Sequence, residues 1–201
     1  MGEETEVATT FEQIAWPVRT ARLTIRPAVP ADLPRLYEIR SQPAVTHWLT
    51  GRTTSYDDYV ERYGAPARMS RTLVVANEAG LVGDLMLQVE SPWSQAEANA
   101  EAENTQAALG WCLDPAHAGC GYATEAAAEL LRLCFEELGL RRVVAGAFAD
   151  NVASIRVMEK IGMRIESRTR RASLHRDLGW LDGVEAAVLV GEWRAKRIDR
   201  P

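Results

Sequence analysis

Two glycines before a long apolar stretch form the part of the sequence whose chemistry is easiest to infer. The run His117-Ala118-Gly119-Cys120-Gly121-Tyr122-Ala123-Thr124 follows a predicted strand that ends at Leu113 and leads directly into a predicted helix. Glycines let a backbone curl with several N–H groups on one side, and the free N–H groups and positive dipole end of the helix lie beside them. Together these groups form an anion site. We therefore expect residues 117–124 to bind a phosphate group.

A Gly-x-Gly turn does not identify the phosphate compound, and two common nucleotide motifs do not fit. The dinucleotide-binding fingerprint needs a third glycine where this chain has Thr124, and it follows the first strand of its unit, whereas this turn lies in mid-chain. A Walker loop needs Gly-Lys-Ser/Thr, which does not follow here. A helix-start turn without any ligand is the remaining alternative.

Other residue types give no competing catalytic motif. Cys120 stands at the predicted helix N-terminus, where the pKa of a thiol falls, so a nucleophilic thiol is an alternative use of that residue. The sequence contains no Gly-x-Ser-x-Gly hydrolase motif, and its histidines lack the spacing of metal ligands: His47, His117 and His175. No metal is therefore predicted.

The composition is that of one ordinary folded domain. Of 201 residues, 47% are hydrophobic and 25% charged, and no apolar run approaches the roughly 18 residues that span a bilayer. The acidic start lacks the features of a secretory signal, and the cysteines have neither zinc-site pairing nor disulfide-scaffold density: Cys112, Cys120 and Cys134. We expect a soluble, cytoplasmic protein with reduced thiols.

The charge argues against a nucleic-acid partner. Non-specific binding to nucleic acid depends on clustered Lys and Arg, whereas the net charge here is -5. The basic stretch 164–176 is local, and we interpret it as a solvated strand edge and loop.

Hydrophobic periodicity predicts the elements that position the turn. The predicted strands are 22–26, 73–76, 81–89, 105–113, 142–148, 163–168 and 184–193, and the predicted helices are 31–41, 56–63, 123–138 and 151–161. The order β-α-α-β-β-β-α-β-α-β-β indicates a mixed α/β fold. Residues 1–19 are predicted to be an N-terminal extension, 91–104 an acidic insert that forms a long loop or a short surface helix, and 196–201 a C-terminal tail.

Several blocks of the sequence resemble the GNAT superfamily of N-acetyltransferases. The coenzyme A loop of that family has the form Gln/Arg-x-x-Gly-x-Gly/Ala, and 116–121 lies on this frame. Residues 110–113 with 119–126, and then 138–143, 151–154 and 159–163, are similar to the ribosomal-protein N-terminal (RimJ/RimL-like) acetyltransferase subgroup. With looser similarities at 22–27 and 179–182, the resemblance covers about 20–194.

The resemblance implies a single GNAT-like domain over 20–195, with a mostly antiparallel central sheet splayed in its middle and helices on both faces. It implies that acetyl-CoA is bound by Trp111, Cys112, Leu113, His117, Ala118, Gly119, Cys120, Gly121, Tyr122, Ala123, Thr124, Asn151 and Ser154. The loop departs from the family pattern at Ala116, which replaces Gln or Arg, and at Cys120, where Lys or Arg is frequent. A cradle made mostly of backbone N–H groups is therefore expected.

The resemblance further implies direct transfer of acetyl to a primary amine, without a covalent enzyme intermediate. Ser154 is the expected proton donor to the leaving thiolate, and Asn151 is expected to cap the helix that carries it. Because an alkylamine with a pKa near 10.4 is mostly protonated at neutral pH, a base is needed. Asp182 matches an acidic position near the subgroup's acceptor site, and Glu103 and Glu90, at the insert, are alternative bases.

The acceptor stays open between a protein N-terminus and a small-molecule amine. Residues 31–63 and the acidic insert are expected to set its identity, and the insert would attract a cationic amine. Two alternatives remain: a non-catalytic acyl-CoA-binding sensor or partner module, and an acyltransferase that uses another acyl-CoA, such as succinyl-CoA. A homodimer through the regions of Trp93 and Trp180 is a further expectation, and no membrane partner is predicted.

Overall fold

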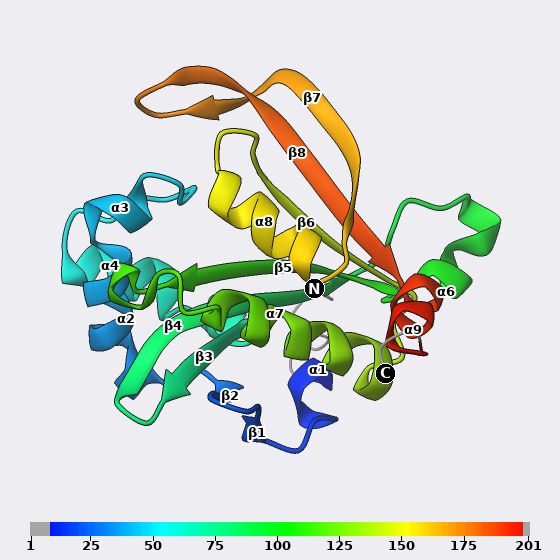
Figure 1. Ribbon diagram of the computed structural model, residues 1–201, viewed down its shortest axis with the longest axis horizontal. Coiled ribbons are helices and arrows are strands. Elements are labelled where there is room, and N and C mark those ends of the chain that lie inside the picture. Colours follow the sequence, from blue (N-terminus) through cyan, green and yellow to red (C-terminus); the bar gives the residue numbers. More distant parts are fainter. Residues whose placement is uncertain (1–8, 199–201) are drawn as a thin grey trace. The chain divides into compact units, whose positions relative to one another are not determined.

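Eight strands form a mixed, mostly antiparallel sheet in the computed structural model, which describes residues 9–198 (Figure 1). Residue contacts divide the chain into unit 1, which comprises 1–87 and 111–130, and unit 2, which comprises 88–110 and 131–201. The chain passes from one unit to the other within β4 (Gly80–Glu90), β5 (Gln106–Leu113) and α7 (Tyr122–Arg132). This mixture of strands and helices agrees with the predicted α/β class.

Unit 1 contains an antiparallel run of strands, in the order β1 (Val18–Arg19), β2 (Thr24–Pro27), β3 (Thr72–Asn77) and β4. Ile25 of β2 lies opposite Val75 of β3, and both side chains are completely buried. The turn between β3 and β4 ends at Gly80, whose φ of 129° is a conformation that glycine adopts readily. The alternation of Leu23 and Ile25 with polar residues therefore identified the inner face of β2 correctly.

The helices of unit 1 are α1 (Thr9–Glu12), α2 (Leu33–Arg40), α3 (Pro43–Thr46), α4 (Tyr56–Tyr63) and α5 (Pro66–Met69). The side chain of Ser55 accepts the N–H of Asp58 and caps α4. Buried Leu36 and Tyr59 pack with Val74 of β3. The two predicted helices 31–41 and 56–63 are confirmed, and their apolar faces cover the sheet of this unit.

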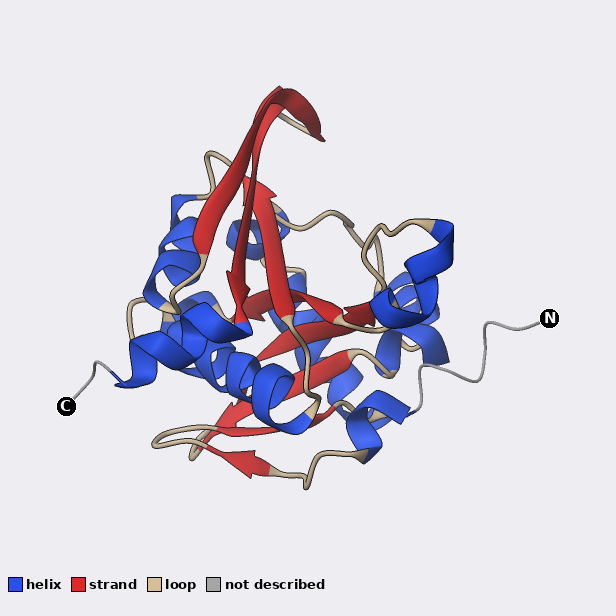
Figure 2. Ribbon diagram, turned by 90° about the vertical axis from the view of Figure 1, so that its right-hand side faces the viewer, coloured by secondary structure: helices blue, strands red, loops and turns tan. Residues whose placement is uncertain are grey.

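Unit 2 contains β6 (Arg142–Phe148), β7 (Arg164–His175) and β8 (Gly179–Leu189), in the order β5-β6-β8-β7. β5 and β6 pair in parallel, and the other pairs are antiparallel. β7 and β8 form a long twisted hairpin, drawn as two red strands in Figure 2. The helices of this unit are α6 (Asn99–Ala102), α8 (Val152–Lys160) and α9 (Val190–Ile198), and a π-helical turn, Leu133–Glu137, follows α7.

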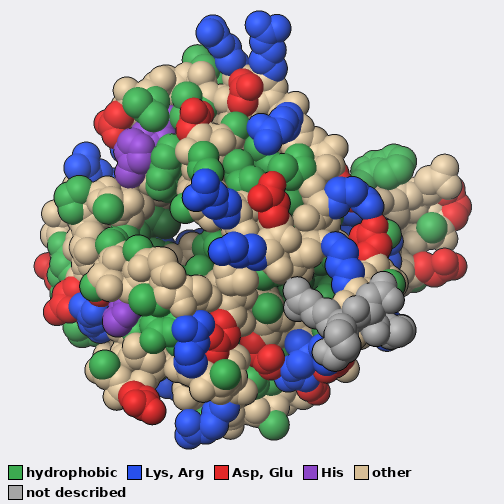
Figure 3. All heavy atoms as spheres, in the orientation of Figure 1, with side chains coloured by type: hydrophobic (Ala, Val, Ile, Leu, Met, Phe, Trp, Pro, Cys, Tyr) green, Lys and Arg blue, Asp and Glu red, His purple; other side chains and the backbone are tan. Residues whose placement is uncertain are grey.

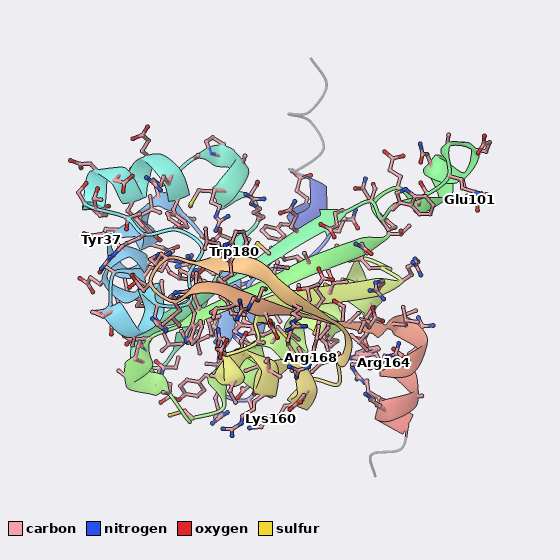
Figure 4. The ribbon with its side chains drawn as sticks, turned by 90° about the horizontal axis from the view of Figure 1, so that it is seen from above. Tyr37, Glu101, Lys160, Arg164, Arg168 and Trp180 are labelled. Atoms are coloured by element: carbon pink, nitrogen blue, oxygen red, sulfur yellow. The ribbon has the colours of Figure 1, made fainter. Side chains whose placement is uncertain are left out.

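The predicted strand 163–168 is too short, because β7 continues to His175. The additional residues carry few apolar side chains, so pairing with β8 and not their own pattern makes them a strand. In the orientation of Figure 1, the basic side chains of this hairpin form the uppermost blue group of Figure 3. Arg164, Arg168 and Trp180 are labelled on it in Figure 4. Most of the stretch 164–176 lies on β7, at the edge of the strand order, and all five of its arginines are exposed: Arg164, Arg168, Arg170, Arg171 and Arg176.

The predicted strand 184–193 is wrong at its end. Strand β8 stops at Leu189 and α9 begins at the next residue, where the carboxylate of Glu192 accepts the N–H of Leu189 (3.0 Å). The ring of Trp193 then packs on Phe135, with ring centroids 5.3 Å apart. A local cap and this packing thus override the strand pattern.

The N-terminal extension contains short elements that the sequence did not predict, and the insert contains a short helix. Helix α1 and strand β1 fall within the predicted extension 1–19, whose residues 1–8 lie outside the described part, as do residues 199–201 of the predicted tail. In the acidic insert, a 3-10 turn (Ala96–Ala98) leads into α6, which is the short-helix form of the prediction. Along residues 9–198, no helix has the length and apolarity needed to cross a membrane.

Candidate functional site

The glycine turn of unit 1 begins at a capped 3-10 helix and ends at α7. The side chain of Asp114 accepts the N–H of Ala116 (3.0 Å), which starts the short helix Pro115–His117. Gly119 and Gly121 follow with φ values of 77° and 80°. A β carbon at Gly119 would meet no atom within 4 Å, so the backbone conformation and not lack of space requires glycine there.

The turn offers a set of main-chain donors. Among residues 119–124, five N–H groups have no hydrogen-bond acceptor in the described part of the chain: those of Gly119, Gly121, Tyr122, Ala123 and Thr124. The first internal bond of α7 runs from the N–H of Glu125 to the carbonyl of Gly121 (3.0 Å), so the three preceding helical N–H groups stay open. Open N–H groups at the positive end of a helix dipole suit an anion.

A clamp formed by Arg22, Glu125 and Thr20 holds this turn to the start of β2. The Arg22 guanidinium donates to the carbonyl oxygen of Cys120 (2.9 Å) and, through Nε, to the Glu125 carboxylate (2.7 Å). The other Glu125 oxygen accepts the N–H of Arg22 (2.9 Å) and the hydroxyl of Thr20 (2.6 Å). Burial raises the pKa of Glu125, but the hydrogen bonds from Thr20 and Arg22 outweigh it and lower that pKa below its ordinary value.

The clamp also orients one of the open donors. In a planar trans peptide the C=O and N–H groups point in opposite directions. Because Arg22 binds the carbonyl of Cys120, the N–H of Gly121 in the same peptide points away from Arg22. Arg22 thereby brings a cation to a loop whose own residues at the two family positions, Ala116 and Cys120, are uncharged.

Arg22 and Thr20 were missed as site residues because no pattern along the chain connects them with Glu125, which lies 103 positions after Arg22. The alternation of charged and apolar residues around Leu23 identified a strand only. The remaining signal was the acidic residue in the first turn of α7, a position that usually complements the helix dipole.

Strand β5, which leads to the turn, lies very close to β4 within unit 1. A β carbon at Gly83 would lie 2.4 Å from the carbonyl oxygen of Cys112, so no larger residue fits. Cys112 is buried near Asp84, and burial first, and then the Asp84 charge, raise the pKa of its thiol to about 12. Trp111 and Leu113 on the other face of β5 are half-buried. Cys112 is therefore a packing residue and not a thiolate.

Ion pairs attach α2 to the same strands. Arg40 binds the buried Asp84 through Nε (2.9 Å) and Nη2. Arg35 donates to Asp114 (2.6 Å), the residue that caps the turn. The N–H of Ala116 and the bonds from Gln42 and Arg35 outweigh burial and lower the pKa of Asp114. Asp114 is thus held ionised at the entry to the turn.

Unit 2 carries the predicted helix cap and the candidate proton donor. The Asn151 side chain accepts the N–H of Ser154 (3.1 Å), so Asn151 caps α8 as predicted. Ser154 is half-buried, and its hydroxyl has no partner in the part of the chain that the structure describes. That hydroxyl is available to a ligand.

The carboxylates predicted as bases have different surroundings within unit 2. Asp182 on β8 is exposed, and it accepts the N–H of Arg171 (2.9 Å), whose φ is 47°. Glu90 accepts from the side-chain amide of Gln106 (2.7 Å). Glu103 follows α6 and is exposed. Across residues 9–198, no hydrogen bond joins Ser154 to any of these three carboxylates.

The remaining predicted contacts line the turn itself. The ring of His117 lies 5.8 Å from that of Tyr122, and the Arg22 guanidinium lies 4.8 Å from the Tyr122 ring centroid. The side chain of Cys120 is exposed, with its sulfur 3.9 Å from the carbonyl of Ala118. Unit 1 therefore brings together all predicted residues from 111 to 124, and unit 2 brings together Asn151 and Ser154.

Known proteins are similar to this chain over a region that includes the glycine turn and the start of α8. The model of the acetyltransferase (GNAT) domain matches residues 22–164. The uncharacterized N-acetyltransferase YnaD of Bacillus subtilis (strain 168) is 27% identical over 179 residues, which cover 88% of this chain and 98% of that protein.

Two solved structures share the fold over 87% of this chain and 99% of their own. A GNAT-family acetyltransferase from Bacillus anthracis has a TM-score of 0.73 at 26% identity. A spermidine N-acetyltransferase from Vibrio cholerae, in complex with CoA and spermine, has a TM-score of 0.70 at 16% identity. The predicted fold class is confirmed by these likenesses.

Proposed function

Because the chain belongs to the GNAT acetyltransferase family, we propose that it transfers an acetyl group from acetyl-CoA to a primary amine while both are bound. The observation that carries the proposal is the glycine turn, whose five open N–H groups can donate hydrogen bonds to the oxygens of a pyrophosphate. The clamp from Arg22 supports it, because it fixes the Cys120–Gly121 peptide.

In this proposal, cofactor binding is divided between main-chain and side-chain groups. Residues 117–124 bind the pyrophosphate, and the main chain of Trp111, Cys112 and Leu113 follows the pantetheine. Asn151 and Ser154 contact the thiol end from the start of α8. Main-chain donors on β5 also face the negative charge that develops on the thioester oxygen.

Ser154 is the proposed proton donor to the departing thiolate, because its hydroxyl is free within the described residues while its N–H is held by the Asn151 cap. Asp182 or Glu103 deprotonates the amine, directly or through water. No covalent intermediate on the protein is required, in line with a buried, protonated Cys112.

The acceptor is proposed to be a small-molecule amine or a protein N-terminus. The CoA and spermine in the complex of the Vibrio cholerae enzyme support an amine acceptor in general terms. We further propose that residues 20–195 form the acetyltransferase domain, that the chain belongs to the RimJ/RimL-like subgroup, and that the protein is a cytoplasmic homodimer.

Thiol release from acetyl-CoA in the presence of a broad amine panel tests the proposal. Transfer above the spontaneous rate is expected, and Ser154→Ala is expected to lower kcat by about 100-fold, the usual contribution of a general acid. Ser167→Ala is the matched control, because that hydroxyl binds Glu185 on the outer hairpin. Tight CoA binding by calorimetry without thiol release from any amine would establish the sensor alternative instead.

A further inference from the structure

Two arginines flank a single tyrosine ring in unit 1. The guanidinium carbons of Arg40 and Arg68 each lie 5.0 Å from the ring centroid of Tyr63. The ring of Tyr59 stacks on Tyr63, with centroids 4.6 Å apart and an interplanar angle of 18°. Tyr37, labelled in Figure 4, lies on α2, and its ring centroid is 5.5 Å from that of Tyr59. Two cations thus border one aromatic cluster between α2, α4 and α5.

The charges in this cluster do not balance. Arg40 binds both oxygens of Asp84. Arg68 is half-buried, and within residues 9–198 no carboxylate lies at ion-pair distance from its guanidinium. Burial first, and then the charges of Arg40 and Arg71, lower the pKa of Arg68, and they outweigh the opposite effects of Tyr63 and Asp84. A desolvated cation beside other cations is unfavourable unless an anion compensates it.

The cluster adjoins the strand that is proposed to hold the cofactor. Asp84, the counter-ion of Arg40, lies close enough to Cys112 on β5 for its charge to raise the pKa of that thiol. At the preceding residue, Gly83, β4 comes into close contact with the main chain of Cys112. The arginine–tyrosine cluster is thus connected with the cofactor strand through Arg40, Asp84 and Cys112.

We propose that Arg68, with Arg40 and Tyr63 beside it, binds an anionic group of the acceptor, so that the preferred substrate is an amine that also carries a carboxylate or a phosphate. The planar guanidinium matches the paired oxygens of either group. The inference rests on the proposed transferase function. It predicts that a polycation such as spermine is a poor acceptor, because Arg68 would repel it.

Anion binding can be measured without any transfer reaction. The Arg68 Nε–Hε resonance, assigned by its loss in Arg68→Gln, is followed by NMR during titration of the full chain with succinate and, separately, with inorganic phosphate. We expect a saturable shift with at least one of the two anions, and the stronger of them identifies the group. Arg62→Gln is the matched control: it removes an equal charge from α4, but Arg62 pairs with Asp58 and not with Tyr63.

Matched acceptors then test the substrate class. Each primary amine is supplied as a free acid and as its amide, for example β-alanine and β-alaninamide, and phosphoethanolamine is compared with ethanolamine. The charged form is expected to have a kcat/KM at least about tenfold higher, which corresponds to one charge-assisted hydrogen bond. Arg68→Gln is expected to abolish that ratio, Arg68→Lys to keep part of it, and Arg62→Gln to leave it unchanged.

The possible failures can be told apart. A linear, non-saturating shift with both anions, or a charged-to-neutral ratio near one in the wild type, overturns the anion site and leaves the transferase proposal standing. A ratio that survives in Arg68→Gln shows that the arginine only stacks on Tyr63. If no amine is acetylated but the saturable shift is present, the transferase proposal fails while Arg68 still binds an anion.

Discussion

Replacement of Arg22 by glutamine removes the guanidinium that holds the glycine turn in place. The side chain would lose its bond to the carbonyl of Cys120 (2.9 Å) and its contacts to Glu125 (2.7 and 2.6 Å). Because 49% of the Arg22 side chain is exposed, the ion pair contributes no more than about 1 kcal/mol to stability. The bond to Cys120 adds about 1 kcal/mol, so Arg22→Gln is expected to lose about 2 kcal/mol of unfolding free energy.

The effect on the cofactor is expected to depend on the pyrophosphate. Without Arg22 the N–H of Gly121 is no longer held in one direction, and the loop loses its neighbouring cation. We expect acetyl-CoA to bind about tenfold more weakly, which is ~1.4 kcal/mol. Acetyl-pantetheine contains the thioester but no pyrophosphate, so its kcat/KM in Arg22→Gln is expected to stay within about twofold of the wild type.

Calorimetric titration with acetyl-CoA, and kinetics with both donors, measure this difference. Arg19→Gln is the matched control, because it removes the same charge from β1, and the Arg19 side chain donates to Thr24 (3.3 Å), with no bond to the turn among residues 9–198. Equal losses with acetyl-CoA and acetyl-pantetheine would show that Arg22 acts on the fold alone. Unchanged acetyl-CoA affinity would refute the orientation of Gly121 by this clamp.

Three further results are expected. Gly119→Ala places a side chain in a left-handed turn with open space around it, so the variant is expected to lose about 1 kcal/mol of unfolding free energy in urea. Gly83→Ala is expected to lose about 3 kcal/mol, because its β carbon would meet a backbone oxygen at 2.4 Å. Equal losses in the two variants would contradict this geometry. The pKa of the Asp114 carboxyl is lowered, first by the N–H of Ala116. The stability that this carboxylate contributes is therefore complete above its unfolded-state pKa near 3.9 and is lost as pH falls through its folded-state pKa. Asp114→Asn is expected to flatten the fall of the urea midpoint below about pH 4, and an unaltered pH profile would exclude this role. Iodoacetamide at about pH 8 is expected to alkylate the exposed Cys120 and to spare the buried Cys112, whose pKa is raised to about 12. Peptide mass spectrometry locates the modified cysteines. Alkylation of Cys112 in the native protein would contradict its burial.

The elements that the sequence predicted are those whose signals are local. The apolar stripe of α7, the short apolar run of β3 and the glycines at 119 and 121 are each determined within a few residues of their own position. The same is true of the Asn151 cap, whose acceptor and donor are three residues apart. Local patterns therefore predicted the candidate phosphate site and the start of α8.

The remaining features depend on partners that are distant in sequence. The extension of β7 to His175 is determined by pairing with β8, and the start of α9 depends on packing of Trp193 against Phe135. The contact of Arg22 with Glu125, and the placement of Arg68 on Tyr63, arise only when separate elements pack together. No periodicity or spacing along the chain encodes such contacts.

A crystal structure with coenzyme A bound is the most direct test of the proposed acetyl-CoA site. The pyrophosphate oxygens are expected to accept the N–H groups of Gly119, Gly121 and the first turn of α7, and the cofactor sulfur is expected to lie beside the hydroxyl of Ser154. A pyrophosphate that is bound elsewhere, with these N–H groups left to water, would contradict this expectation.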